Sequence, residues 1–352
     1  MTAAQHSGEL TCWVVSDGRA GIEIQCRGLA EAIGLQPVVK RIKARAPWRW
    51  LPPAFWFDPL RRLAPSGDRM QPPWPDLLIG TGRLAVAPNL AVRRASRGGT
   101  FTVQIQDPKV ALDHFDVVIA PEHDRLSGPN VIATRGSLHG ITEARLAAAA
   151  AEWQAGIVQL PRPRVTVLIG GDSRTHRMTR QHAERLAAGL AALAREQGAG
   201  LLVTPSRRTG DATLAIVRAA LAGLPAVIWD GSGANPYLGY LALADAFVVT
   251  GDSVNMICEA AYTGKPIHLA EIGGGTDKFE RFHESMARAG IVRPFAGRVE
   301  QWRYAPLRET EAVAAELRRR LGLPERASPQ ASAAEPAIGP ALGASLGGPI
   351  DL

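Results

Sequence analysis

The 352-residue chain is predicted to form two α/β domains, each a doubly wound parallel sheet, that face one another across a cleft. Short apolar, β-branched runs alternate with longer Ala- and Leu-rich stretches of helical period, which is the pattern of βαβ units. This alternation occurs twice along the chain. A length of 352 residues suits two domains of about 100–200 residues each.

The first series predicts a domain over residues 9–158. Its strand-like runs lie at 10–15, 37–42, 76–80, 101–106, 116–120 and 130–134. A helical pattern, IEIQCRGLAEAIG, follows the first of these runs after the turn SDGRAG. Because this turn is not G-x-G-x-x-G, it does not favour a dinucleotide site.

The second series predicts a domain over residues 159–301, beginning just after Pro161 and Pro163. Strands are expected at 164–171, 200–206, 225–230, 246–251 and 266–270, with helices near 178–197, 211–222, 236–243 and after 253. A helix is also expected at 308–322, in a segment 302–323 that packs back on the first domain. Residues 324–352 are rich in Ala, Pro, Gly and Ser and are expected to be disordered.

Composition indicates a cytoplasmic chain, attached at most peripherally to the inner face of a membrane. Its three cysteines, Cys12, Cys26 and Cys258, have neither CxxC nor Cys/His spacing, which favours reduced thiols. We find no run of about 18 apolar residues and no signal-peptide core in MTAAQHSGEL. A net charge of +7 permits an anionic partner: nucleic acid, a lipid surface or a phosphorylated small molecule.

The stretch TGDSVNMICEAAYTGKP, residues 250–266, is the most informative for function. With Ser253 near the N-cap, Val254, Ile257, Cys258 and Ala261 share the face expected to pack on the sheet. Asn255 and Glu259 lie on another face. The helix N-terminus suits a phosphate, and Glu259 can accept hydrogen bonds from the vicinal hydroxyls of a ribose. The alternative is that Glu259 is an ordinary solvated helix residue.

The segment ADAFVVTGDSVNMICEAAYTGKP resembles the donor domain of GT-B glycosyltransferases. The resemblance implies that Glu259 binds the nucleotide ribose and that GGDSR and GGGTDK face the diphosphate and the donor sugar. Together with the other loops at the carboxyl ends of the strands, it gives these expected donor-binding residues: Gly171, Ser173, Arg174, Ser206, Arg207, Gly251, Ser253, Asn255, Glu259, Thr276, Asp277 and Lys278. Retaining enzymes of this fold often carry an acid about seven residues before the ribose acid, and Asp252 stands there.

The segments VVSDGRAGIEIQCRGLAEAIG, IGTGRLAVAPNLAVRR, TFTVQIQDPKV, FDVVIAPEHD and SGPNVIATRGSLHGIT are similar to the ELM1-type family. This resemblance covers roughly residues 10–300. The family is named after a plant mitochondrial fission protein that recruits a dynamin-like protein. Its bacterial members are described as glycosyltransferase-like or as sugar-nucleotide epimerases, so the resemblance leaves the function open.

The equivalent loops of the first domain are expected to face the acceptor. They offer Arg19, Gly82, Arg83, Gln106 and Asp107 as acceptor-side residues, and Asp17, His123 and Asp124 as candidates for the catalytic base. Asp17 can instead be a turn or N-cap residue, and His123 a capping or loop histidine. His139 and His268 are expected to be structural. Without a D-x-D motif or a His/Asp cluster, we expect neither a metal nor any other cofactor besides the donor substrate.

Residues 40–63, KRIKARAPWRWLPPAFWFDPLRRL, hold five aromatic and seven basic residues against one acid. Trp48, Arg49, Trp50 and Trp56 are expected to contact an anionic membrane. The alternatives are an apolar arm packed under the first domain, and a nucleic-acid site, which no accompanying motif supports. The leading hypothesis is a sugar transferase that acts on a lipid-linked or membrane acceptor of the envelope glycolipid type. The other hypotheses are a non-catalytic membrane-recruited scaffold and a sugar-nucleotide 2-epimerase.

Overall fold

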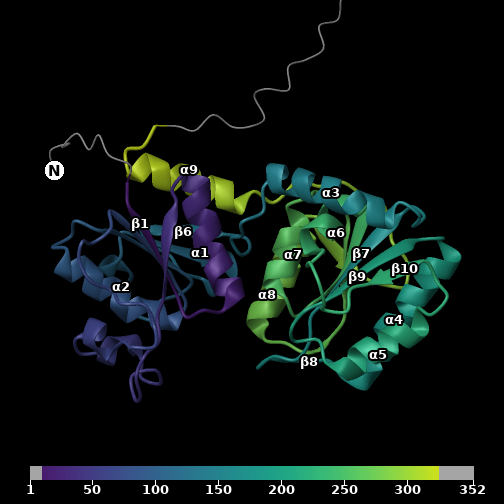
Figure 1. Ribbon diagram of the computed structural model, residues 1–352, viewed down its shortest axis with the longest axis horizontal. Coiled ribbons are helices and arrows are strands. Elements are labelled where there is room, and N and C mark those ends of the chain that lie inside the picture. The colour runs from purple at the N-terminus through teal and green to yellow at the C-terminus, as the bar shows by residue number, and fades with distance from the viewer. Residues whose placement is uncertain (1–9, 325–352) are drawn as a thin grey trace, which may run out of the picture.

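Two six-stranded parallel sheets form the framework of the protein in the computed structural model, which describes residues 10–324 (Figure 1). The first sheet has the order β2-β1-β3-β4-β5-β6 and the second β10-β9-β7-β11-β12-β14. Both were expected from the repeated βαβ pattern. The first sheet contains β1 (Cys12–Ser16), β2 (Pro37–Arg41), β3 (Leu77–Thr81), β4 (Phe101–Ile105), β5 (Val117–Pro121) and β6 (Val131–Thr134).

The second sheet orders its strands differently: counted along its own part of the chain the order is 3-2-1-4-5-6, whereas that of the first sheet is 2-1-3-4-5-6. It contains β7 (Arg164–Ile169), β9 (Gly200–Pro205), β10 (Ala226–Ile228), β11 (Ala246–Thr250), β12 (Ile267–Ala270) and β14 (Val292–Pro294). Beyond the carboxyl ends of its strands, β8 (His176–Arg177) and β13 (Gly273–Gly274) form a small antiparallel pair. This pair joins two of the loops in which donor-binding residues were expected.

Helices cover both faces of each sheet. They are α1 (Ala20–Ile33), α2 (Arg83–Ala95), α3 (Glu143–Ile157), α4 (Arg180–Glu196), α5 (Asp211–Ala220), α6 (Tyr237–Leu243), α7 (Val254–Ala261), α8 (Asp277–Arg288) and α9 (Glu309–Arg320). Short 3-10 turns are η1 (Pro53–Phe55), η2 (Pro59–Arg62), η3 (Leu112–His114) and η4 (Glu122–Asp124). We did not expect α2, which contains Pro88, or α3, whose Ala-rich sequence has little apolar periodicity.

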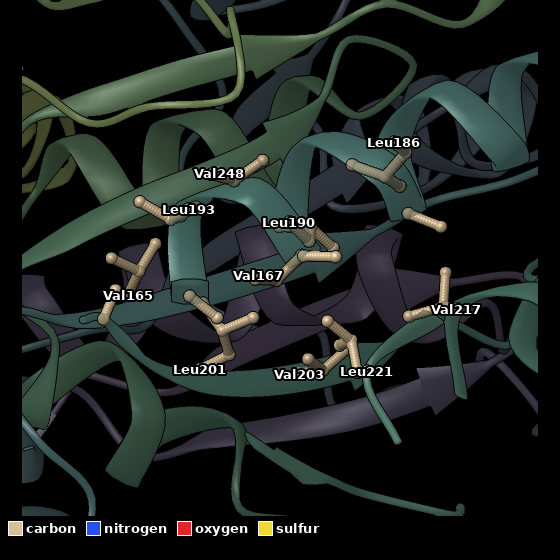
Figure 2. Close-up of a cluster of buried hydrophobic side chains, with 14 of the residues drawn as sticks. Val165, Val167, Leu186, Leu190, Leu193, Leu201, Val203, Val217, Leu221 and Val248 are labelled. Carbon is tan, nitrogen blue, oxygen red and sulfur yellow. The ribbon is translucent and has the colours of Figure 1, made fainter. Parts of the chain in front are cut away.

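The core of the second half shows why these residues form layers. Val165, Val167, Leu201 and Val203 point from β7 and β9 into a buried cluster, and side chains of α4 and α5 complete it (Figure 2). β-Branched residues fit the pleated strands, while leucines at helical spacing on α4 present one apolar face. Each fully buried Leu or Val contributes about 1.5–3 kcal/mol relative to exposure.

The chain crosses between the two halves twice, once before β7 and once after β14. Helix α3 packs on α6, although residues 143–157 lie in the range expected for the first domain. Helix α9 returns to pack on α1, where Val313, Ala314 and Leu317 join the core of the first half (Figure 1). Packing therefore divides the chain before α3 rather than after residue 158. The tail expected at 324–352 lies, beyond Pro324, outside the described residues.

Residues 42–70 form an arm between β2 and β3, and its core is apolar. Ile42, Trp56, Leu63 and Met70 are buried in one cluster with Trp13 of β1. Trp56 is only 7% exposed, and its indole N–H donates to the Leu51 carbonyl. The expectation that Trp56 contacts a membrane is therefore wrong. The arm therefore has an apolar core. It also has an exposed side, on which Trp50 is 64% exposed.

Across residues 10–324, no helix is long and apolar enough to cross a membrane. The three cysteines are free and buried, and burial raises the pKa of the Cys12 and Cys258 thiols to about 12. They act as small apolar side chains, as their scattered spacing indicated.

Candidate functional site

Helix α7 begins as the sequence predicted. Ser253 has extended backbone dihedrals, and its Oγ accepts a hydrogen bond from the Met256 N–H at 3.4 Å. Ile257 and Ala261 are fully buried against the second sheet, whereas Cys258, which was expected there too, is buried with its Sγ accepting a hydrogen bond from the Ser137 N–H at 3.2 Å. This fixes the opposite face of α7, which carries Asn255 and Glu259, toward the first half of the molecule.

A cavity of about 880 Å³ lies between the two halves, and α7 forms part of its wall. Ser253, Asn255 and Glu259 line it from α7, and Ser206 and Arg207 line it from the loop after β9. The first half contributes the α1 face that includes Glu23 and Arg27 (Figure 1). Five of the expected donor-binding residues are thus brought to one cavity, whose size suits a nucleotide-sized ligand.

Glu259 is the acid that the sequence singled out, and its surroundings are unusual. The Tyr237 hydroxyl donates a hydrogen bond to its Oε2. Burial raises the pKa of Glu259 to about 7, while this hydrogen bond acts in the opposite direction. Glu259 is therefore neither a freely solvated helix residue nor part of an ion pair. An acid kept in this state in a cavity wall is typical of a binding or catalytic site.

The N-terminal end of α7 is held in place by a buried carboxylate. Asp252 accepts hydrogen bonds from the Gly171 N–H at 3.0 Å and the Thr250 hydroxyl at 2.6 Å, and it pairs with Arg208 at 2.7 Å. Its side chain is fully buried. Asp252 therefore joins the ends of β7 and β11 to the loop after β9, and its position seven residues before Glu259 serves packing here.

Gly171 is required by the close approach of that loop. A Cβ at Gly171 would lie 2.0 Å from the Arg208 carbonyl oxygen. We expected its amide to face the donor diphosphate, but Asp252 already accepts the hydrogen bond from that N–H. The basic groups at this end of the larger cavity come instead from Arg207 and Arg208, both of which line it.

A second, smaller cavity of about 320 Å³ lies on the other side of α7. His123 and Asp124 of η4 line it together with Thr276 and Lys278 at the start of α8. Asn255 lines both cavities, so the two cavities adjoin at this residue. The smaller cavity thus places two of the candidate bases beside residues expected to face the donor sugar.

His123 is buried and neutral in this cavity. Burial, and next the charge of Lys278, lower the pKa of His123 to about 4. Its ring packs edge-on against Phe282, with the centroids 5.5 Å apart. Its Nδ1 is buried and has no hydrogen-bond partner among residues 10–324. An unpartnered imidazole nitrogen can accept a proton, but this one is closed off from solvent, so a ligand reaches it only if the surrounding side chains move.

Residues that line the smaller cavity also make contacts between the two halves. Lys278 pairs with Asp124 at 2.5 Å, and Arg281 donates to the His123 carbonyl at 3.3 Å. The Asp124 side chain is 7% exposed, so this ion pair is largely removed from water. Asp124 is thus paired with Lys278 through Oδ1, while its Oδ2 and the His123 Nδ1 are both buried without a hydrogen-bond partner among residues 10–324.

Gln106 also lines the smaller cavity, directly after β4. Its φ of 71° lies in the left-handed region, which a residue with a Cβ rarely adopts. The strained conformation is kept by a hydrogen bond from its N–H to the Ile119 carbonyl at 2.8 Å. Strain of this kind, which costs about 1–3 kcal/mol, concentrates at functional sites.

Comparison with known sequences identifies the family. The sequence profile described as "Mitochondrial fission ELM1" matches residues 20–321. The chain belongs to the ELM1 family. The mitochondrial fission protein ELM1 of Arabidopsis thaliana is 34% identical over 274 residues, which cover 70% of this chain and 64% of that protein. The chain therefore spans less than two thirds of the length of this relative. The uncharacterized protein RP120 of Rickettsia prowazekii (strain Madrid E) is 26% identical over 280 residues, or 68% of this chain and 78% of the relative.

Solved structures show the same architecture. The crystal structure of Acinetobacter baumannii MurG matches with a TM-score of 0.51 at 14% identity, covering 89% of this chain and 90% of MurG. The UDP-GlcNAc 2-epimerase of Methanocaldococcus jannaschii, in complex with UDP-GlcNAc and UDP, matches with a TM-score of 0.51 at 10% identity, covering 89% of this chain and 99% of the enzyme. At these identities the likeness concerns the fold, and it confirms the GT-B-like architecture of this ELM1-family protein.

Several expected residues of the ELM1-family protein line neither cavity. Asp17 pairs with Arg19 at 2.6 Å, and Asp107 with Lys109 at 2.5 Å. Arg83 donates to the backbone of the arm at Leu51. The remaining members of this group are Gly82, Gly171, Ser173, Arg174, Gly251 and Asp277. Their assignment to a donor or an acceptor stays a prediction.

Two functional candidates were missing from the sequence interpretation. Tyr237, which holds Glu259, begins α6 directly after the loop DGSGANP, and this position at a strand's carboxyl end was the available signal. Gln25 of α1 donates to the Asn255 side chain at 3.3 Å, 230 residues away in sequence. No local pattern could reveal that contact. Within residues 10–324, no group of three His, Cys, Asp or Glu side chains is placed to hold a metal ion.

Proposed function

We propose that this ELM1-family protein is a metal-independent glycosyltransferase of the GT-B type. In this proposal a nucleotide-diphosphate sugar occupies the larger cavity, and its sugar is transferred to a membrane-associated acceptor. The observation that carries the proposal is the partly buried Glu259, which Tyr237 orients in the wall of an interdomain cavity. Its pKa of about 7 gives it an ionised form at neutral pH that can accept hydrogen bonds from hydroxyl groups.

The geometry of α7 supports a nucleotide that lies along the helix. Ser253 and Glu259 are separated by about 9 Å along the axis, at 1.5 Å per residue. The helix N-terminus and Arg207 favour the diphosphate at one end, while Glu259 receives the ribose at the other. Because the Tyr237 hydroxyl donates to Oε2, the Glu259 carboxylate is held in one orientation. Its Oε1 is then the oxygen that accepts hydrogen bonds from the ribose.

The smaller cavity supports the transfer step itself. With the sugar beyond Asn255, we assign His123 as the base, because the charge of Lys278 is paired with the Asp124 carboxylate through Oδ1. In a direct displacement, His123 accepts the proton of the acceptor hydroxyl while the acceptor oxygen bonds to the anomeric carbon. The bond to the diphosphate oxygen breaks, and the diphosphate leaves with its electron pair toward the cationic end of the larger cavity.

A solved structure of the same fold also supports a nucleotide sugar as the donor. The M. jannaschii enzyme with this architecture was crystallised with UDP-GlcNAc and UDP. This supports a nucleotide sugar as the ligand class, without choosing the base or the sugar.

Calorimetric titration of the full chain with UDP-, GDP-, ADP- and CMP-sugars tests the donor site. We expect saturable binding to one base, weakened about tenfold or more by Glu259→Ala, since a hydrogen bond to a charged group contributes about 1.5–3 kcal/mol. Glu184→Ala, an exposed change on α4 outside both cavities, is the matched control. Absence of binding across the panel would refute the donor assignment.

A second candidate is a scaffold without catalysis, which the Arabidopsis relative, a mitochondrial fission protein, favours. In that case nucleotide sugars bind without any turnover, with or without acceptors. A 2-epimerase is favoured by the likeness to the M. jannaschii enzyme in fold. It would interconvert free nucleotide sugar, which NMR of the sugar protons detects directly.

A further inference from the structure

The exposed aromatic side chains of the protein are concentrated in the arm. Trp50 is 64%, Phe55 60% and Phe57 74% exposed, and no other Trp or Phe among residues 10–324 belongs to the exposed class. These three residues lie within eight positions of one another. The other exposed large apolar residues, Ile24, Val38 and Val158, are aliphatic and scattered. A cluster of exposed aromatics on one segment marks an interaction surface.

The arm presents these side chains from a fixed base rather than from a loose loop. Trp48 packs edge-to-face on Trp56 with the ring centroids 6.5 Å apart, and Trp56 belongs to the buried cluster that contains Trp13. Arg83 at the start of α2 donates to the Leu51 carbonyl at 2.8 Å and also to the Arg49 carbonyl. The arm is thus attached to the first half next to α2, on the side remote from the second half (Figure 1).

Basic residues accompany the exposed aromatics in the same segment of the chain. Residues 42–63 contain five Lys or Arg residues and one acid, Asp58, which pairs with Arg61 at 3.2 Å. The Arg49 guanidinium lies 4.1 Å from the centre of the Trp50 ring. Aromatic rings beside guanidinium groups match the region between acyl chains and anionic phosphates at a bilayer surface, since the rings enter the interface and the cations meet the phosphates.

We propose that the arm docks the protein on an anionic lipid bilayer, with Trp50, Phe55 and Phe57 inserted at headgroup depth. The docking concerns the arm alone and needs neither nucleotide nor catalysis. The arm is connected to the wall of the larger cavity at its root, where Arg41 pairs with the lining residue Glu23 at 2.8 Å. Docking of the arm would hold the protein at the membrane that carries the acceptor of the proposed function. The docking itself does not depend on whether sugar transfer occurs.

Co-sedimentation of the full chain with vesicles tests the docking. One set of vesicles contains equal parts of phosphatidylcholine and phosphatidylglycerol, and the other contains phosphatidylcholine alone. We expect binding to the anionic vesicles that weakens with added salt. The triple variant Trp50→Ala/Phe55→Ala/Phe57→Ala should lower the partition coefficient about tenfold or more, because it removes the inserted apolar area.

A second variant and two controls separate docking from loss of structure. Arg49→Gln/Arg61→Gln should lower binding to anionic vesicles about tenfold or more, since each cation near such a surface contributes to attraction. Val158→Ala and Arg195→Gln, exposed changes of matching type in the second half, should bind as the wild type does.

Three outcomes overturn the proposal. The first is wild-type protein that stays in the supernatant with anionic vesicles, and the second is a triple variant that sediments as well as the wild type. The third is a single-stranded RNA that binds through the same aromatics while vesicles are not bound, which would make nucleic acid the partner. Because no nucleotide sugar is present, a negative vesicle result leaves the calorimetric test of the donor site unaffected, and the reverse also holds.

Discussion

The pH dependence of nucleotide binding tests the role given to Glu259. Burial raises the pKa of this carboxyl from its ordinary value of 4.5 to about 7. Ribose hydroxyls donate to an ionised carboxylate, so the ligand selects the ionised form. Below pH 7 the free protein carries a proton on Glu259 that must leave on binding. The affinity is therefore expected to rise with pH up to about 7 and to be constant above it.

The size of the effect follows from the loss of one proton. The binding constant of such a site changes by up to tenfold per pH unit below the pKa, so Kd should fall about a hundredfold between about pH 5 and about pH 8. In Glu259→Gln this slope disappears. At about pH 8 the variant should bind about tenfold to a hundredfold more weakly than the wild type, because it loses a charged hydrogen-bond acceptor.

Calorimetry with the best nucleotide-diphosphate sugar of the panel measures this profile, since the diphosphate of such a ligand releases no proton in the range. Titrations in two buffers of different ionisation enthalpy count the released protons directly. Glu184→Gln should keep the wild-type slope. A flat wild-type profile, or an unchanged slope in Glu259→Gln, would refute the reasoning.

The same titration should appear in stability without ligand. The folded-state pKa of about 7 lies above the unfolded value of about 4.5, so the folded protein binds the additional proton in this range. The stability of the wild type relative to Glu259→Gln should therefore fall as pH rises from about 4.5 to about 7. At about 1.36 kcal/mol per pH unit, the loss has an upper limit of about 3 kcal/mol.

Three further changes test the packing around the site by urea unfolding. Gly171→Ala should cost about 1–3 kcal/mol because its Cβ would meet a carbonyl oxygen at 2.0 Å, whereas Gly156→Ala, in open space on α3, should gain about 0.5–1 kcal/mol. Asp252→Ala should cost about 3 kcal/mol, since it leaves a buried amide and a guanidinium without their acceptor. Lys278→Ala should cost about 1–3 kcal/mol by exposing an unpaired buried carboxylate, and Asp124→Asn added to it should recover part of that loss.

Much of the fold was predictable because its signals are local. The β-branched runs of β1, β7 and β11 carry the period of buried strands, and Ser253 followed by an amphipathic pattern marks the start of α7. Helix α3 was not predicted, because its many alanines differ too little in hydrophobicity from the neighbouring residues to mark an apolar face. Its place on α6 depends on partners such as Tyr240, which packs edge-on against Trp153 at 6.2 Å.

The aromatic arm shows the limit of composition. The sequence indicated that Trp48, Trp50 and Trp56 belong to one unusual segment, but composition cannot tell a core tryptophan from a surface one. The structure buries Trp56 and exposes Trp50, because Pro-rich turns direct alternate residues of the segment inward and outward. Phe55 and Phe57, which we had not selected, are the residues that reach solvent.

By itself, the sequence determined the two-sheet architecture, the family and the importance of Glu259, since each depends on residues close together in the chain. Only the tertiary structure decided which candidates share a cavity. It joined Glu259 to Tyr237, placed Asp252 in a structural network and left His123 unpaired beside the Asp124–Lys278 ion pair. Those outcomes depend on contacts between residues far apart in the chain, such as Asp124 and Lys278, and on the burial that shifts a pKa, neither of which local sequence encodes.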